Sequence, residues 1–473
     1  MSVRNFPSIV GLSFGNLVVG LSILLPTAML AELSSGLAVS IGEAGLLISL
    51  GAAVVCISPP LVASLISRIE RRALLSAILL LLAFGHIGSA FVPNFTSLLA
   101  IRLAMLAFAG AFTPLAAETA ALVVGEQQRS SAVALALLGW ALAMAAGLPA
   151  VAVVAPLIGW RAVYELVGVL AGLGFFVLVL GLRPGIVGAP IVFATWSAVS
   201  RNSALLVLLL ITGLLGAGQL VVVGFVGPLL TQLVGATSQQ IALVFGLFGV
   251  MNVVGNVCSA RLVQSWGAFT TSVAFVLCVV AGLAAWTLGS GMFWVMASGA
   301  AIWGFGSAAA AAMQQVRLIA AAPLLATASV SLNNTVLYLG QAIGAGIGGA
   351  LYTRGQFGAI GFTALATIGL AFILIWFTRT APSLDGAQFD DETIRLLARA
   401  FDSAWDRYLE NAATDEDATS RHAELANYIV ALAKAGERDE DHLSMKGYMR
   451  LRAMQSVPTR SGLADPAETV LPD

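Results

Sequence analysis

Lysine and aspartate are both absent from the first 379 residues of this 473-residue chain. The charge in that stretch comes from thirteen arginines and only six glutamates. Charged residues make up 10% of the whole chain and hydrophobic residues 59%, whereas soluble domains carry about a quarter charged residues. A chain with so few charges cannot cover itself with a polar surface, so the composition predicts a membrane protein.

Cysteine is also scarce, and its three copies, Cys56, Cys258 and Cys278, lie inside apolar runs. Their odd number and unrelated spacing indicate no disulfide framework and no metal site. The sequence also shows no nucleophile–base pair and no cofactor motif, so we expect no enzyme activity and no cofactor. The net charge of −1 gives no indication of nucleic-acid binding.

Apolar runs of about 20 residues or more, the length that crosses a bilayer as a helix, recur along the chain. Six precede a longer polar interruption at 183–203, and six follow it. The sequence thus predicts an all-α membrane protein with twelve transmembrane helices in two pseudo-symmetric six-helix bundles, 1–182 and 204–379. The runs are near 6–33, 42–66, 73–93, 97–122, 132–157, 161–182, 204–232, 239–263, 269–288, 292–318, 327–353 and 358–379.

The arginines between these runs fall mostly on one side of the predicted membrane. Ten of them, including Arg68, Arg71 and Arg72, share that side, and only Arg161 and Arg354 lie on the other. Positive residues collect on the cytoplasmic side. We therefore expect a multi-pass protein of the inner (cytoplasmic) membrane with both termini in the cytoplasm.

Small residues are spaced one helical turn apart in two of the runs. The run 132–157 carries Gly139, Ala143 and Gly147, and the run 327–353 carries Gly340, Gly344 and Gly348. Such ridges let helix backbones approach closely in lipid and occur in many helical bundles. Their matched positions in the two halves favour a transporter built from a structural repeat.

Several short motifs occur in the order typical of one transporter family. They include Leu24-Leu25-Pro26, Arg102 followed by Gly110-Ala111-Phe112-Thr113-Pro114, Gly147-Leu148-Pro149 and Gly159-Trp160-Arg161. The chain resembles the major facilitator superfamily, in particular the arabinose-efflux-like branch of its twelve-helix drug:proton antiporters. This resemblance implies a monomer that exports a small organic molecule by alternating access, with protons as the exchanged ion.

Two departures from the family pattern bear on the gate, which the first should weaken, and on energy coupling. Ser67 stands where the family loop usually has an aspartate, and Val18 stands where many members have a membrane carboxylate. The missing carboxylate keeps open the alternative of an uncoupled uniporter. A third alternative, from another class, is a membrane sensor or scaffold that does not transport and signals through the acidic tail.

The resemblance also implies which helices line the substrate cavity. Polar side chains on these helices and their neighbours are expected to face protein or water rather than lipid. For the amides, bonding to a neighbouring helix and contact with substrate are equal alternatives. Arg102 is favoured as functional because a charge at that depth needs an anion or carbonyl partner. The candidate substrate-cavity residues are Asn16, Arg102, Gln219, Asn252, Trp303, Gln314, Asn333 and Tyr338.

A second candidate group is expected at the cytoplasmic end of the first half. Glu118 follows Arg102 by sixteen residues, which places it about 24 Å deeper along a helix and level with the basic loop. The resemblance implies an ion pair there that acts as a gate, with proton carriage by Glu118 as the second interpretation. The candidate gate and coupling residues are Ser67, Arg68, Arg71, Arg72 and Glu118.

The remaining polar features are His86 and the charged C-terminal tail. His86 lies on a run that is usually peripheral in the family, and a helix-packing role is favoured over proton transfer. After Arg379 the chain has eighteen acidic and ten basic residues. Apolar residues at helical spacing there predict a small helical cytoplasmic tail over 380–457, followed by a disordered terminus at 458–473.

Overall fold

The structure is a computed structural model of the chain. All of its regular elements within the described residues are helices. The residues that it describes are 6–66, 69–125, 128–187, 199, 202–321, 326–378, 391–411, 421, 425–426, 428–430, 432–433 and 436–455.

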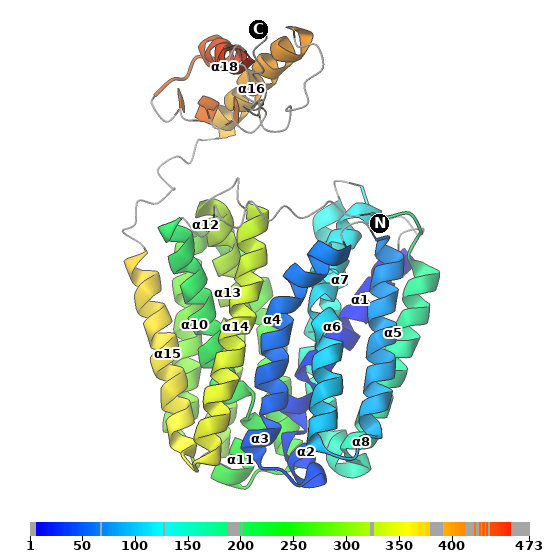
Figure 1. The fold of residues 1–473 in the computed structure, drawn as a ribbon. Coiled ribbons are helices and arrows are strands. Elements are labelled where there is room, and N and C mark those ends of the chain that lie inside the picture. Colours follow the sequence, from blue (N-terminus) through cyan, green and yellow to red (C-terminus); the bar gives the residue numbers. More distant parts are fainter. Residues whose placement is uncertain are drawn as a thin grey trace, which may run out of the picture. The chain divides into compact units, whose positions relative to one another are not determined.

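The predicted all-helical membrane fold is confirmed (Figure 1). Within the described chain, nine helices are long and apolar enough to cross a membrane, and two 51-residue stretches among them turn midway and cross twice. These nine helices account for eleven crossings, and α14 supplies the twelfth. The long helices are α1 (Phe6–Ala28), α4 (Leu46–Ile66), α5 (Arg71–Ala90), α6 (Phe95–Val123), α7 (Arg129–Leu142) with η2 (Ala143–Gly147) and α8 (Leu148–Gly181), α10 (Ser203–Val223), α12 (Ser238–Leu288), α13 (Phe293–Ala321), α14 (Ala326–Thr353) and α15 (Phe357–Phe377).

The two turns inside α8 and α12 each depend on one glycine. Gly159 has φ 82° and ψ 154°, and Gly267 has φ 74° and ψ 164°. This region of backbone space is open essentially to glycine alone. A single residue therefore reverses the chain between two crossings in each half.

Two crossings end earlier than the apolar runs predict. The run 6–33 is broken after Ala28, and a separate short helix, α2 (Leu30–Leu37), follows it. The run 204–232 is broken in the same way into α10 and α11 (Val226–Val234). A further short helix, α3 (Ile41–Ala44), precedes α4. Hydropathy alone does not register these breaks because the residues on both sides are apolar.

The helices pack into two halves of similar construction. In the first half, α1 packs against α6, α7 and α8, α4 against α6, and α5 against α8. In the second half, α10 packs against α14 and α15, and α12 against α13 and α15.

The two glycine ridges occupy equivalent places in the halves. A Cβ atom on Gly139 would overlap the Ser13 carbonyl of α1, and a Cβ atom on Gly340 would overlap the Gly213 carbonyl of α10. Each ridge therefore lets one helix approach the first helix of its own half. The ridges serve helix packing in both halves, as expected for a repeat.

The halves meet closely at the end of the bundle where α2, α3 and α11 lie, which we call the closed end. There Gly42 of α3 lies against α14, and a Cβ atom on it would overlap the Thr353 hydroxyl and lie 3.0 Å from the Gly349 carbonyl. Phe225, which precedes α11, stacks on Tyr352 with ring centroids 5.9 Å apart. One hydrophobic cluster includes residues of both halves at this end, for example Leu33 and Phe225.

Residues 382–473 form a compact unit separate from residues 1–381. Its described helices include α16 (Asp391–Asn411) and α18 (Glu440–Gln455). Their apolar faces pack around a small core that contains Leu397, Tyr408 and Leu443. The predicted disordered segment 458–473 lies outside the described residues.

Candidate functional site

Arg102 of α6 is 1% exposed and is held by three backbone carbonyls. Its Nε donates to the Leu47 carbonyl at 2.7 Å, and its two terminal nitrogens donate to the carbonyls of Ser22 at 3.0 Å and Ile23 at 2.8 Å. These acceptors lie on α4 and α1. The sequence predicted an anion or a carbonyl group as the partner of Arg102, and in the structure its partners are backbone carbonyls.

The sequence around Ser22 explains why its carbonyl is free to bind Arg102. In a helix this carbonyl would accept the N–H four residues later, but that residue is Pro26, which has no N–H. The guanidinium replaces the missing donor. Gly51 of α4 lies beside this group: a Cβ atom there would be in van der Waals contact with Arg102 Nε at 3.4 Å and would press on Leu106 Cδ1 at 2.9 Å.

Ser22 also bonds to a buried histidine, which the sequence did not predict. The Nε2 atom of His86, on α5, lies 2.7 Å from the Ser22 hydroxyl, which itself donates to the Val18 carbonyl at 2.8 Å. The His86 ring packs against Tyr164 of α8 with centroids 5.6 Å apart. His86 therefore joins three helices of the first half, in agreement with a packing role.

Arg71 and Glu118 form an ion pair in the first half. Arg71 begins α5, Glu118 lies near the end of α6, and the Arg71 guanidinium donates to the carboxylate at 2.7 Å. The arginine side chain is 4% exposed and the glutamate side chain 37% exposed. Both partners belong to the same half, so this pair does not itself tie the two halves together.

The segment before Arg71 is fastened to the chain that leaves the first half. The Glu70 carboxylate accepts the Gly185 N–H at 2.7 Å, and the Arg71 N–H donates to the Ile186 carbonyl at 2.8 Å. Arg72 is half-buried and has no ion pair with a described residue. The other two predicted gate residues, Ser67 and Arg68, lie outside the described residues.

Three of the predicted cavity amides bond to neighbouring helices. The Asn16 amide donates to the Ala136 carbonyl of α7 at 2.9 Å. Gln314 of α13 donates to the Ser272 hydroxyl at 3.0 Å, and Asn333 of α14 accepts from the Thr212 hydroxyl at 2.7 Å. Ser272 and Thr212 were missed because hydroxyl side chains are common in membrane helices and carry no spacing signal.

Three other predicted cavity residues have no hydrogen-bond partner within the described chain. They are Gln219 on α10, Asn252 on α12 and Tyr338 on α14, all half-buried. Tyr338 packs against the hydrophobic cluster of the first half, so it reaches across from the second half. These three side chains therefore retain hydrogen-bonding groups without a partner in the described chain.

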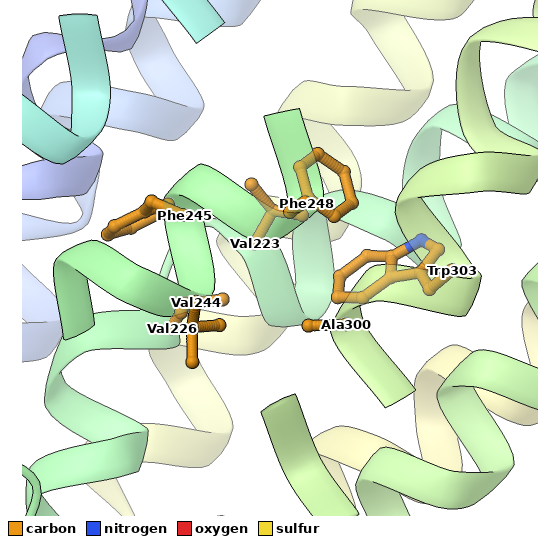
Figure 2. Close-up of a pocket in the computed structure, with 7 residues that line it drawn as sticks. All are labelled: Val223, Val226, Val244, Phe245, Phe248, Ala300 and Trp303. Atoms are coloured by element: carbon orange, nitrogen blue, oxygen red, sulfur yellow. The ribbon is translucent and has the colours of Figure 1, made fainter. Parts of the chain in front are cut away.

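Trp303 of α13 is fully buried in the second half and borders a small apolar pocket of about 10 Å³. Figure 2 shows its indole beside Phe248, with ring centroids 5.1 Å apart, and Ala300 one turn away. The pocket has room for about one water molecule but offers only apolar side chains. It serves as packing space rather than as a polar binding site.

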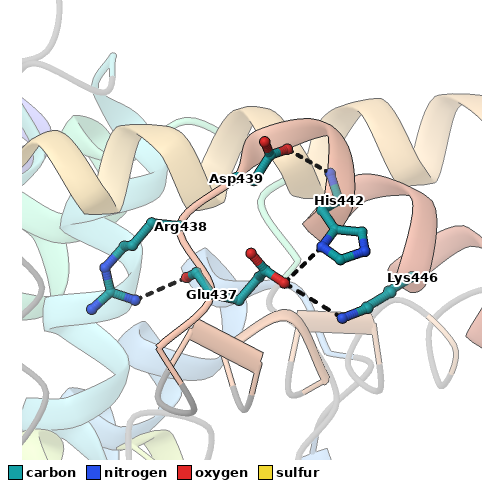
Figure 3. Close-up of polar contacts among 5 residues, drawn as sticks. All are labelled: Glu437, Arg438, Asp439, His442 and Lys446. Atoms are coloured by element: carbon teal, nitrogen blue, oxygen red, sulfur yellow. Dashed lines mark hydrogen bonds and ion pairs between the residues drawn. The ribbon is translucent and has the colours of Figure 1, made fainter.

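The C-terminal unit has its own group of charges (Figure 3). The Glu437 carboxylate lies 2.8 Å from His442 Nδ1 and 3.4 Å from Lys446 Nζ. Partial burial raises the pKa of this carboxyl, but hydrogen bonds from the Asp439 backbone, His442 and Lys446 outweigh that effect, so its pKa lies below the ordinary value. The cluster fixes the start of α18.

The Arg71–Glu118 contact predicts energetic coupling that Arg72 does not share. Reversing both charges, Arg71→Glu with Glu118→Arg, is expected to recover part of the stability lost in each single variant, with coupling of about 0.5–3 kcal/mol. Arg72→Glu is the matched control and should add to Glu118→Arg without coupling. Thermal unfolding of the purified variants measures both cycles, and additive losses at Arg71 would contradict the pair.

The family model described as Major Facilitator Superfamily matches residues 12–336 of this chain. The "Inner membrane transport protein YdhP" of Escherichia coli is 29% identical over 377 residues, which cover 79% of this chain and 96% of the relative. A "Probable sugar efflux transporter" of Mannheimia succiniciproducens is 25% identical over 380 residues, which cover 78% and 92%.

Solved structures of transporters share the fold. A bacterial homologue of the human lysosomal transporter Spinster, in an inward-facing and unoccupied conformation, has a TM-score of 0.60 at 14% identity and covers 81% of this chain and 96% of its own. The peptide transporter POT has a TM-score of 0.64 at 17% identity and covers 80% and 95%.

Proposed function

Because this chain belongs to the Major Facilitator Superfamily of membrane transporters, we propose that it exports a small organic molecule by alternating access in exchange for protons. The relatives are transport proteins, and one is named as a probable sugar efflux transporter. Two similar halves packed closely at one end of the bundle are the parts that such a cycle requires.

One observation carries the choice of substrate contacts. Among the predicted cavity residues, Gln219, Asn252 and Tyr338 are half-buried and have no hydrogen bond to a described residue. Asn16, Gln314 and Asn333 are buried and bonded to other helices, although Asn16 Oδ1 and Gln314 Oε1 have no partner in the described chain. A substrate held by two amides and a phenol would be polar, because these groups offer hydrogen bonds but no charge. Substrate identity is approached by thermal stabilisation against a metabolite and drug library, since a molecule that binds the native state raises its apparent stability.

Proton coupling is assigned to Glu118 in this proposal. It is the partly exposed carboxylate of the Arg71 pair, so a proton arriving from water can compete with the arginine for it. A proton bound by Glu118 during the transport cycle would displace Arg71 from the carboxylate. The ion pair would then form again when the proton leaves.

An uncoupled uniporter remains the second candidate function, and one observation favours it. Val18 occupies the position of the family's membrane carboxylate and is fully buried, so α1 offers no titrating group there. Wild-type protein in proteoliposomes that equilibrates substrate but never concentrates it under a pH gradient would support this candidate. The scaffold alternative is tested by whole-cell export after removal of residues 382–473, because a scaffold that signals through the tail would show no transport.

The proposal includes an orientation in which the closed end faces outward. Thr96, exposed beside the start of α6, and Asp441, exposed on α18, are suitable sites for single cysteines in a cysteine-free background. An impermeant thiol reagent on intact cells is expected to label Thr96→Cys and not Asp441→Cys. Labelling of Asp441→Cys in intact cells would contradict the cytoplasmic placement of the tail.

A further inference from the structure

A cavity of about 440 Å³ lies between the halves at the closed end. One wall comes from α3 and the start of α4, with Ser40, Glu43 and Ser49. The other comes from the last turns of α14, with Gly346 and Thr353. Pockets for small organic ligands have about this volume. The cavity belongs to neither group of candidate transport residues described above.

Exposed apolar side chains border the cavity on both helices, which favours an opening toward the bilayer. Leu46, which lines it, is 39% exposed, and Leu50 on the next turn of α4 is 40% exposed. On α14, Ile343 and Ile347 are 54% and 41% exposed. Since α4 and α14 cross the membrane side by side (Figure 1), these exposed apolar side chains face hydrocarbon. They form an apolar groove that leads along the two helices into the cavity.

The wall formed by α3 and α4 carries a buried hydroxyl, Ser49, and an exposed carboxylate, Glu43, and both have hydrogen-bonding atoms without a partner. Ser49 is only 7% exposed, yet its hydroxyl has no hydrogen-bond partner within the described chain. Glu43 is the one charged side chain among the lining residues, and its Oε2 accepts from both the N–H and the hydroxyl of Ser40 at 2.8 Å. The second carboxylate oxygen remains available. A ligand that fits must therefore offer a hydrogen-bond donor with positive charge.

We propose that this cavity binds the head group of a membrane lipid that carries an amine, with its acyl chain in the groove between α4 and α14. The ammonium group would lie at Glu43 and donate to its carboxylate, and the Ser49 hydroxyl would bond to a polar oxygen of the same head group. Because the two walls belong to different halves, a bound lipid stabilises the form in which the closed end is packed. This assignment does not depend on the transported substrate.

Two substitutions test separately the charge of Glu43 and the space inside the cavity. Glu43→Gln removes the charge but keeps the α3 cap, because glutamine also serves at this position of a capping box with Ser40. Gly346→Trp fills the cavity, and the space around the Gly346 Cβ position is empty to 4 Å. Gly358→Trp on α15 is the matched control, since that glycine also has empty space around it and lies outside the cavity.

The measurement is native mass spectrometry of the full-length protein released from nanodiscs that contain equal amounts of phosphatidylethanolamine and phosphatidylglycerol. Wild type and Gly358→Trp are expected to retain one phosphatidylethanolamine in preference to phosphatidylglycerol. Glu43→Gln should lower that preference about threefold to tenfold, the effect of one charge-assisted hydrogen bond near the surface. Gly346→Trp should lose the retained lipid.

Equal retention of the two lipids by wild type would overturn the assignment of an amine head group. Unchanged phosphatidylethanolamine retention in both Glu43→Gln and Gly346→Trp would overturn the site. If Gly346→Trp is not recovered as a monodisperse protein, Glu43→Gln alone decides the matter, because it changes no packing. None of these outcomes depends on transport activity, so the result stands apart from the proposed function.

Discussion

Glu118→Gln is expected to abolish uphill transport driven by a pH gradient in proteoliposomes while downhill counterflow remains measurable. Glutamine keeps the size of the side chain and its hydrogen-bonding oxygen but cannot exchange a proton. A coupled antiporter needs a titrating group whose protonation changes its affinity for substrate. Loss of coupling without loss of exchange is therefore the signature of a proton carrier, and the expected drop in accumulated substrate is to the level of the gradient-free control.

The control for this experiment concerns the arginine that Glu118 leaves behind. Arg71 is 4% exposed, and removing one member of a buried pair leaves an uncompensated charge, which destabilises proteins. The double variant Arg71→Gln with Glu118→Gln removes both charges and should fold at least as well as the single variant while still failing to accumulate substrate. Uphill transport retained by Glu118→Gln would exclude this residue as the carrier.

Arg102→Met is expected to destabilise the protein by about 3 kcal/mol. The substitution keeps much of the volume but removes the guanidinium donor from the carbonyls of Ser22, Ile23 and Leu47. The Ser22 carbonyl then has no helical N–H to replace it, because Pro26 has none. Arg102→Lys should lose less because an ammonium group can still reach one of them. Thermal unfolding in detergent measures the loss, and Arg72→Met is the matched control with little expected change.

Pro26→Ala provides an independent test of this arrangement. Alanine restores an N–H four residues after Ser22, so the Ser22 carbonyl regains a partner inside its own helix. In the double variant Pro26→Ala with Arg102→Met, the loss of stability should be smaller than the sum of the two single losses. Additive losses would mean that Arg102 does not compensate for the proline.

The twelve crossings could be predicted from the sequence because their signal is length and apolarity, which the bilayer imposes on each helix separately. The interruptions inside those runs could not. Met29 and Phe225 leave helical geometry among residues as apolar as their neighbours, since packing of the two halves at the closed end selects the short helices α2 and α11. Hydropathy contains no information about that packing.

The candidate site, like the fold, could be predicted only in part. Glu118 could be placed level with the basic loop from helix rise alone, but only the packing of α5 on α6 distinguishes Arg71 from its neighbour Arg72. The need of Arg102 for partners followed from its burial, and Pro26 four residues after Ser22 was a signal for one of them. The choice between interhelical bonding and substrate contact for Asn16, Gln314 and Asn333 required three-dimensional neighbours.

The one-residue turns at Gly159 and Gly267 have a mechanical consequence. A turn of one residue leaves no extra chain between the two crossings on either side of each glycine. Those two crossings must therefore move together as one rigid body. Inserting residues at such a turn would uncouple the two crossings without changing any polar group. Motion between the halves would therefore have to move each of these pairs of crossings as one body.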